Sequence, residues 1–236
     1  MPMLRGTRPL KRWTWVGAFG RDVMLCAAVA RIGPLATSWW AVWDGRSLRE
    51  KTVRRALDVT AERVRVPDVL DLRVEPGAAV EVVSPHGRQY AWTRKREALV
   101  RGVALGRAVE ARGLVDESAG YHARKTAWWW SAGAGVAASG EPVTWNLVAG
   151  LHDGSPSERT VWVGGEPHEA GPAAFDGLRG VGGLRFTALA SRARRENLVI
   201  ASSDYEQPFG TFAGELPMAG ALNEGFGVME RHDVRW

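Results

Sequence analysis

The sequence predicts an all-β fold of antiparallel strands, built either as one large barrel or sandwich or as two related β-lobes. Apolar and charged residues alternate with a period of two in several segments, as they do in strands that are buried on one face. Turn-forming pairs such as Asp44-Gly45 and Gly182-Gly183 separate these segments at short intervals. No segment sustains the 3.6-residue apolar period of a helix, and a length of 236 residues suits a large all-β domain.

The expected strands follow this alternation in chain order. Residues 47–64 are the best candidate for a helix, but Arg and Thr interrupt their apolar stripe, so we expect strand there. Alternation is clearest at residues 63–66, 71–74, 80–82 and 159–163. Roughly a dozen strands can be counted in this way. We expect residues 1–236 to form a single domain, with a boundary near residues 108–116 if it consists of two lobes.

The composition points away from several classes of protein. Cys26 is the only cysteine and lies in an apolar segment, so we expect a small buried side chain rather than a disulfide or a nucleophile. The 31 basic and 26 acidic residues give a pI of about 9.9. The basic residues are spread over alternating strands, with one tight cluster at residues 93–96. Because a nucleic-acid-binding protein gathers them on one face beside stacking aromatics, we expect no nucleic-acid partner.

No segment has the pattern of an export signal or a membrane span. The basic residues at the start of the chain are followed by Arg21, Asp22 and Arg31, which leave no uncharged apolar core for a secretory signal. The longest uncharged run, residues 126–140, is too short and too rich in small residues to cross a bilayer. We therefore expect a cytoplasmic protein without an integral membrane segment.

Several segments match part of a known functional motif but lack the rest of it. Gly133-x-Gly135-x-x-Ala138 resembles a dinucleotide fingerprint, yet residues 139–142 break the chain where the helix should begin, so residues 126–151 are expected to form a hairpin. Tyr121-x-x-x-Lys125 resembles a dehydrogenase pair but lacks the preceding βαβ unit. The five histidines lack the short spacings of a zinc site. We expect no metal and no cofactor.

Residues 113–130, GLVDESAGYHARKTAWWW, combine ionisable and aromatic side chains more densely than any other part of the chain. Buried ionisable groups are costly unless they are paired or used, so this density marks the expected site. On a strand, Asp116 and Glu117 point to opposite faces. Trp128 and Trp130 likewise share one face, and Trp129 takes the other.

The remaining chemistry is that of acids and bases beside aromatic rings. Strand parity at the end of the chain places Glu230 and His232 on one face and Arg231 and Asp233 on the other. A carboxylic acid can protonate an alkene, and aromatic faces stabilise the resulting cation. The candidate catalytic residues are Asp116, Glu117, Tyr121, His122 and Glu230. The candidate ligand-binding residues are Arg124, Trp128, Trp130, Trp145, Asn146 and His232.

The chain resembles a bacterial family, the domain of unknown function 2804, over nearly its whole length. The resemblance rests on motifs that occur in order, at residues 8–20, 92–95, 113–135, 145–153, 157–163, 196–217 and 225–236. Members of that family commonly carry a histidine where this chain has Lys125, and some have a longer N-terminal portion. Because the family has no assigned function, the resemblance implies no reaction.

A shorter resemblance concerns the carotenoid hydratase and tocopherol cyclase group. Gly120-Tyr121-His122 before a tryptophan-rich strand, and Gly225-x-Gly227-x-Met229-Glu230 near the end, are similar to motifs of those two-lobed, lipocalin-like proteins. The resemblance implies a calycin-type β fold and a hydrophobic small-molecule partner, terpenoid or lipid-like. It also implies hydration, isomerisation or cyclisation by acid-base chemistry. The alternative is a lipocalin-like carrier or a structural protein without catalysis.

Overall fold

The computed structural model describes residues 1–86, 88–154, 156–198 and 201–235, and these residues form strands and no helix. The first eleven strands are β1 (Leu4–Arg5), β2 (Arg8–Pro9), β3 (Lys11–Phe19), β4 (Met24–Ile32), β5 (Leu35–Trp43), β6 (Leu48–Val53), β7 (Asp58–Val59), β8 (Arg63–Val66), β9 (Leu70–His86), β10 (Gln89–Ala104) and β11 (Arg107–Gly120). The others are β12 (Lys125–Ala137), β13 (Pro142–Ala149), β14 (Thr160–Val163), β15 (Glu166–Glu169), β16 (Gly180–Val181), β17 (Gly183–Leu198), β18 (Ala201–Leu216) and β19 (Gly220–Arg235).

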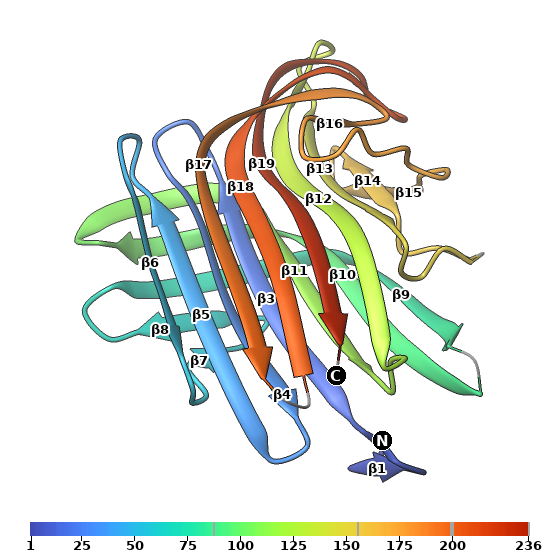
Figure 1. The fold of residues 1–236 in the computed structure, drawn as a ribbon. Helices are drawn as coiled ribbons and strands as arrows, with labels where there is room; N and C mark the ends of the chain where they lie inside the picture. The colour runs from blue at the N-terminus through green and yellow to red at the C-terminus, as the bar shows by residue number, and fades with distance from the viewer. Residues whose placement is uncertain (87, 155, 199–200, 236) are drawn as a thin grey trace. The chain divides into compact units, whose positions relative to one another are not determined.

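The chain divides into two compact units, Met1–His122 and Ala123–Trp236. The first unit contains a nine-stranded antiparallel sheet in the order β6-β5-β4-β3-β11-β10-β9-β8-β7 and the small β1-β2 sheet. The second contains an eight-stranded antiparallel sheet in the order β15-β14-β13-β12-β19-β18-β17-β16. The long strands of each sheet are curled (Figure 1). The all-β, antiparallel fold class is confirmed.

The two sheets have equivalent topology. In the first unit the first long strand, β3, pairs with both its successor β4 and the last strand β11. In the second unit β12 pairs in the same way with its successor β13 and the last strand β19. Each unit is therefore a meander whose last strand returns to its first, so that residues distant in sequence meet at the centre of the sheet.

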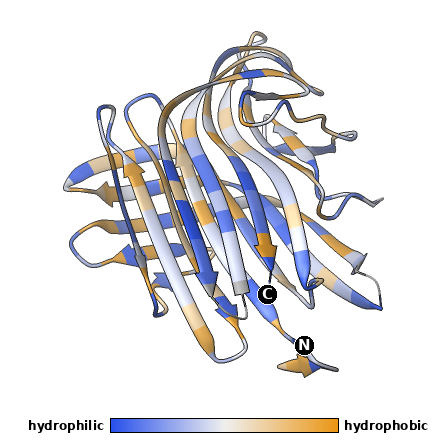
Figure 2. Cartoon of the chain, in the orientation of Figure 1, coloured by the Kyte–Doolittle hydropathy of each residue, from blue (hydrophilic) through white to orange (hydrophobic). Residues whose placement is uncertain are grey.

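Each sheet buries an apolar core on one face. In the first unit, β3, β4, β10 and β11 contribute alternate residues to a cluster that includes Val16, Leu25, Val100 and Val115. The short strand β7 contacts β3 and β4, which closes the curl over this cluster. The core of the second unit includes Trp145, Leu147 and Phe212. Alternating hydropathy along the strands, visible as bands in Figure 2, produces these two-sided sheets.

The structure agrees with several local expectations and adds detail to others. Residues 47–64 contain β6 and β7 and run into β8, as strand rather than helix. The hairpin expected at residues 126–151 is the β12-β13 pair. Residues 108–116 lie inside β11, and the chain divides after that strand, between His122 and Ala123. None of the described residues belongs to a helix that could span a membrane.

Candidate functional site

In the first unit, Asp116 lies at the centre of the sheet in a buried ion pair. Its carboxylate is 2.5 Å from Lys95 Nζ, and the two residues are directly opposite each other on β11 and β10. Trp13 Nε1 on β3 donates a longer hydrogen bond of 3.4 Å to the other carboxylate oxygen. Both partners of the ion pair are buried. A buried pair of this kind holds its charges in place, because separating them would leave one uncompensated.

Glu117 points to the opposite face of β11, as strand parity predicts. Its Oε2 accepts hydrogen bonds of 2.9 Å from Arg94 Nε and from Arg96 Nη2. The cluster at residues 93–96 is thus divided between the two faces, with Lys95 on Asp116 and the two arginines on Glu117. Its charges are largely compensated within the unit.

Tyr121 and His122 follow β11 at the end of the sheet and are both buried. The Tyr121 hydroxyl donates to Pro2 O at 2.7 Å, and the His122 ring lies 5.2 Å from the Trp13 ring. Lys11 Nζ donates to His122 O at 3.3 Å. Burial, with a smaller contribution from Arg8, lowers the pKa of Lys11 to about 8. These contacts tie the end of β11 to the start of the chain.

In the second unit, Glu230 on β19 is the buried carboxylate at the centre of the sheet. Its Oε1 accepts a 2.8 Å hydrogen bond from Trp128 Nε1 on β12, and its Oε2 accepts one of 2.8 Å from Gln207 Nε2 on β18. Two neutral donors on the neighbouring strands therefore hold this carboxyl group. Both Glu230 and Gln207 are buried.

Aromatic rings surround His232, two residues after Glu230 on the same face. The imidazole lies 4.4 Å from the Trp128 ring and 5.1 Å, edge-on, from the Tyr205 ring. Its Nε2 is 2.8 Å from Ser203 Oγ, in a hydrogen bond whose direction depends on the tautomer. Burial lowers the pKa of His232 to about 4; Asp204 raises it and Arg231 lowers it by smaller amounts. The ring is neutral at pH 7.

A buried arginine completes this face of the second unit. Arg192 Nη1 donates to the Tyr205 hydroxyl at 3.3 Å, and its guanidinium lies 5.1 Å from the centre of the Tyr205 ring. Arg192 is directly opposite Gln207 on the paired strands β17 and β18. Three adjoining strands, β17, β18 and β19, thus contribute polar side chains to this face. We call these five residues the polar cluster: Arg192, Tyr205, Gln207, Glu230 and His232.

The tryptophans of the second unit divide between its two faces. Trp128 and Trp130 share the face of Glu230, and Trp129 contacts Phe175, which confirms the expected parity. Trp130 Nε1 donates to Asn146 Oδ1 at 2.7 Å, and Asn146 Nδ2 in turn donates to Glu158 O. Trp145 lies elsewhere: it is fully buried in the apolar core, edge-on to Phe212.

The expected ligand-binding set is therefore not one cluster. Strand parity places Trp145 on the face opposite to Asn146, its neighbour in sequence, so the two cannot line one surface. Arg124 precedes β12 and is exposed. Asp116, Tyr121 and His122 belong to the first unit, and Trp128, Trp130, Asn146, Glu230 and His232 belong to the second.

The two units repeat one arrangement at equivalent positions. A tryptophan on the first long strand donates its indole N–H to a carboxylate on the last strand, Trp13 to Asp116 in one unit and Trp128 to Glu230 in the other. The sequence separations are 103 and 102 residues. The third partner differs, because Lys95 faces Asp116 whereas Gln207 bonds to Glu230. In both units, therefore, an indole N–H from the first long strand is bonded to a buried carboxylate on the last strand.

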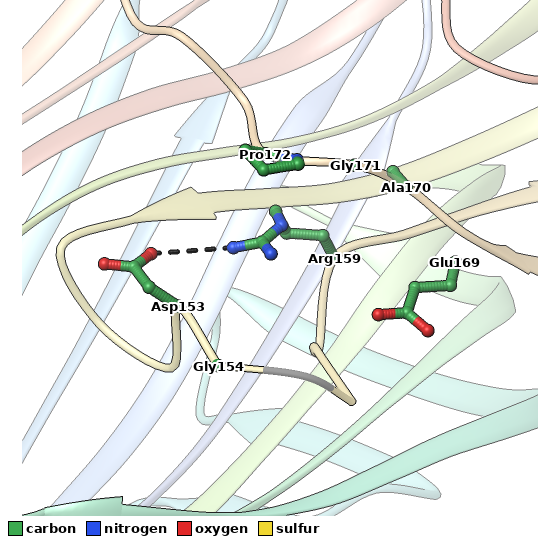
Figure 3. A pocket seen from close by; sticks show the side chains of 7 residues that line it. All are labelled: Asp153, Gly154, Arg159, Glu169, Ala170, Gly171 and Pro172. Atoms are coloured by element: carbon green, nitrogen blue, oxygen red, sulfur yellow. Dashed lines mark ion pairs between the residues drawn. The ribbon is translucent and has the colours of Figure 1, made fainter.

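A surface pocket of about 450 Å³ lies in the second unit, away from the polar cluster. Its lining residues are Asp153, Gly154, Arg159, Glu169, Ala170, Gly171 and Pro172. Figure 3 shows the buried Arg159 guanidinium between the carboxylates of Asp153 and Glu169, with an ion pair of 3.5 Å to Asp153. Glu169 also accepts a hydrogen bond from Ser157 N. These interactions hold the segment after β13 in place, and we assign the pocket residues a structural role.

Sequence reasoning missed Arg192, Tyr205 and Gln207. Their signal was the alternation of Tyr205 and Gln207 on one strand, which places both side chains on one face. What the sequence could not supply was the register that sets these residues against Glu230 and His232.

Comparison with known proteins finds similarity in structure only. No protein-family model matches the sequence, and no curated protein sequence matches it. A protein of Nitrosomonas europaea provisionally named AttH is 12% identical, with a TM-score of 0.50 over 97% of this chain and 93% of that one. Kievitone hydratase from Nectria haematococca is 9% identical, with a TM-score of 0.39 over 94% of this chain and 88% of that one. CghA is also 9% identical, with a TM-score of 0.43 over 95% and 88%.

At such low identity the similarity to the Nitrosomonas protein concerns the fold alone. It covers 97% of this chain and so extends over both all-β units. The resemblance to the domain of unknown function 2804 remains a prediction. A shared fold does not determine function, which depends on the side chains at the site.

Proposed function

We propose that the second unit binds a hydrophobic small molecule, terpenoid or lipid-like, and acts on it by general acid-base catalysis with Glu230 as the proton donor. The position of Glu230 carries the proposal: a buried carboxyl group held by an indole and an amide, beside the rings of Trp128 and His232. A carboxyl group buried beside aromatic rings is a candidate proton donor, because ionisable groups in such surroundings are common at functional sites.

The proposed reaction is the addition of water to a carbon–carbon double bond. Glu230 gives its proton to one alkene carbon, and the faces of Trp128 and Trp130 stabilise the cation at the other. Water attacks that carbon, and the proton it releases returns to the Glu230 carboxylate, so water is consumed and the acid is regenerated. Loss of a neighbouring proton instead of water attack gives an isomer by the same residues.

The other members of the polar cluster have supporting roles in this proposal. His232 is neutral at pH 7, so it can accept the proton of the attacking water and pass it on. Arg192 and Tyr205 form a polar end at which an oxygen of the ligand can bind. Asp116 and Glu117, candidates from the sequence, are assigned to structural ion pairs with Lys95 and with Arg94 and Arg96.

A carrier without catalysis is the second candidate. The observation that favours it is the internal bonding of the polar side chains: Glu230 to Gln207 and Trp128, and Trp130 to Asn146. A buried network of this kind can have the purely structural role of fixing the positions of the side chains that it joins. The two candidates share the ligand and differ in whether it is converted.

The experiment combines native mass spectrometry of the purified protein with extraction of the bound molecule. The extracted molecule is then incubated with the wild type, Glu230→Gln, Asp116→Asn and Glu117→Gln, and a change in mass or retention is followed. We expect the wild type to convert it and Glu230→Gln to be slower by about a hundredfold or more. Glu166→Gln, a change of an exposed carboxyl on β15, is the matched control and should retain full activity.

The outcomes separate the candidates. Binding without conversion by the wild type favours the carrier. Conversion that survives Glu230→Gln but is lost in Asp116→Asn would place the acid in the first unit. Conversion that survives in all three carboxyl variants would end the acid-base proposal.

A further inference from the structure

One end of the sheet in the first unit has an unusual combination of side chains. A row of directly paired residues on five neighbouring strands marks where this end begins. From β4 to β9 the row consists of Ile32, Lys11, Gly120, Ala91 and Ser84. The described segments at or beyond this row are residues 1–11, 32–35, 84–86, 88–91 and 120–122. We call them, with Arg12 and Arg31 beside the row, the basic end. Figure 1 shows β1 and the hairpin joining β4 to β5 at this end of the unit.

Charge at the basic end has one sign. Its sequence contains no Asp or Glu, but it contains Arg5, Arg8, Arg12, Arg31 and Arg88. Arg5 is directly opposite Arg8 in the β1-β2 pair, and Arg12 is directly opposite Arg31 in the β3-β4 pair. Like charges in opposed positions destabilise a strand pair. A negatively charged surface in contact with them would remove this repulsion.

The contacts of these arginines are not ion pairs. Arg8 donates to Tyr121 O at 3.3 Å, and the Arg5 guanidinium lies 4.9 Å from the centre of the Tyr90 ring. In the part of the chain that the structure describes, none of Arg5, Arg8, Arg12 and Arg31 forms an ion pair with a carboxylate. This contrasts with Arg94 and Arg96 on the same sheet, which share Glu117.

Apolar side chains at the basic end are exposed. Leu4 on β1 and Leu35 at the start of β5 are 63% and 73% exposed, and Met3 is 49% exposed. Backbone hydrogen bonds bring them together, since Leu10 N donates to Met3 O and Gly33 N donates to Leu10 O. Figure 2 shows hydrophobic colour both at β1 and at the tip of the β4-β5 hairpin. These exposed apolar side chains and the arginines that lack a carboxylate partner among the described residues together form an amphipathic surface.

We propose that the basic end is a docking surface for an anionic lipid bilayer. The arginines meet the lipid phosphates and acidic headgroups, and the side chains of Met3, Leu4 and Leu35 enter the boundary between headgroups and acyl chains. Peripheral attachment needs both contributions, because neither a few charges nor a few apolar side chains hold a protein at a membrane alone.

Other partners suit this surface less well. A second copy of the chain would bring arginines against arginines. A nucleic acid would use the arginines but has no place for exposed aliphatic tips. Only a bilayer offers negative charge at its surface and an apolar layer directly beneath it. The proposal is independent of any reaction in the second unit.

The test is flotation of the full chain with vesicles of phosphatidylcholine alone and of phosphatidylcholine with 30% phosphatidylserine, a composition of roughly the charge of a cytoplasmic leaflet. We expect binding to the anionic vesicles, little binding to the neutral ones, and weakening at high salt. Arg12→Gln and Arg31→Gln should each lower the partition coefficient about fivefold. Leu35→Ser should lower it about tenfold.

Matched controls lie outside the basic end. Arg65→Gln changes an exposed arginine on β8, and Met218→Ser changes a residue that is 64% exposed at the β18-β19 turn; neither should alter flotation. Equal losses in these controls, or no binding to anionic vesicles, would overturn the proposal. So would Leu35-dependent dimerisation without vesicle binding, which favours a second copy. Salt-sensitive binding to RNA, unaffected by Leu35→Ser and without flotation, would also overturn it.

Discussion

At the scale of single residues, the protein has two buried carboxylates in equivalent places with different partners. Asp116 pairs with Lys95 and accepts a hydrogen bond from the Trp13 indole, and Glu230 accepts hydrogen bonds from the Gln207 amide and the Trp128 indole. The ion pair with Lys95 gives Asp116 a structural role, because separating the two buried charges would leave one of them uncompensated. Burial alone would not distinguish the two residues, since both are almost fully covered.

The ion pair of the first unit should matter for stability. We expect Asp116→Asn to lower the free energy of unfolding by about 3 kcal/mol, because Lys95 is then buried without its counter-charge. The double variant Lys95→Met/Asp116→Leu should recover most of the loss, since it buries apolar groups of similar volume. Urea unfolding of the three proteins measures this. A single variant within about 0.5 kcal/mol of the wild type would contradict the structural role.

His232 should make the stability depend on pH. Its pKa is about 4 in the folded protein and near 6.5 when unfolded, so the unfolded state binds more protons between these values. Stability from this residue is present above pH 6.5 and is lost as the pH falls toward 4, by at most about 3 kcal/mol. Denaturant unfolding of the wild type and His232→Gln at pH 7 and pH 4 should show a smaller pH effect in the variant. Equal losses in both proteins would assign the pH effect to other groups.

At the scale of strands, β12 is shaped by small residues that let neighbouring elements approach closely. A Cβ at Gly133 would overlap the ring of Trp145 and would lie 2.6 Å from Phe226 O on β19. The glycine is therefore needed where the core tryptophan crosses β12. This is also why the apparent Gly-x-Gly motif occurs in a strand without a phosphate-binding helix.

We expect Gly133→Ala to destabilise the second unit by about 1 to 3 kcal/mol, because the core must shift to admit the methyl group. Gly171→Ala, where nothing lies within 4 Å of the new atom, should change stability by less than about 0.5 kcal/mol. Thermal unfolding of the two variants gives the comparison. Equal effects would mean that the overlap at Gly133 is relieved without cost.

The sequence predicted features that depend on neighbouring residues and did not predict those that depend on pairing between distant strands. Strand parity is local, so the faces of Asp116, Glu117, Trp128, Trp130 and Glu230 were all predictable. Pairing between distant strands is not local, and the contacts of Glu230 with Gln207 and of Asp116 with Lys95 had no sequence signal. Trp145 was misjudged for the same reason, because only the sheet partners show which face meets the core.

At the scale of the whole molecule, the two units share a topology and a tryptophan–carboxylate pair, with Lys95 bonded to one carboxylate and Gln207 to the other. This comparison yields a direct test of what the amide at position 207 contributes. Gln207→Lys would replace the amide that donates to Glu230 by an ammonium group, as Lys95 is bonded to Asp116. We expect the variant to bind the ligand and melt within a few degrees of the wild type, while conversion of the ligand falls about a hundredfold. Unchanged conversion with a bound ligand would show that the neutral donor is not required.

The return of the last strand to the first in each unit has a consequence for how the protein is made. β3 cannot gain β11 as its neighbour, nor β12 gain β19, until about a hundred further residues have left the ribosome. Until then the first strand of each unit has one bare edge, and at chain-growth rates of about 5 to 20 residues per second this lasts several seconds. The hydrogen bonds of Trp13 with Asp116 and of Trp128 with Glu230 can therefore form only after the last strand of each unit has been added.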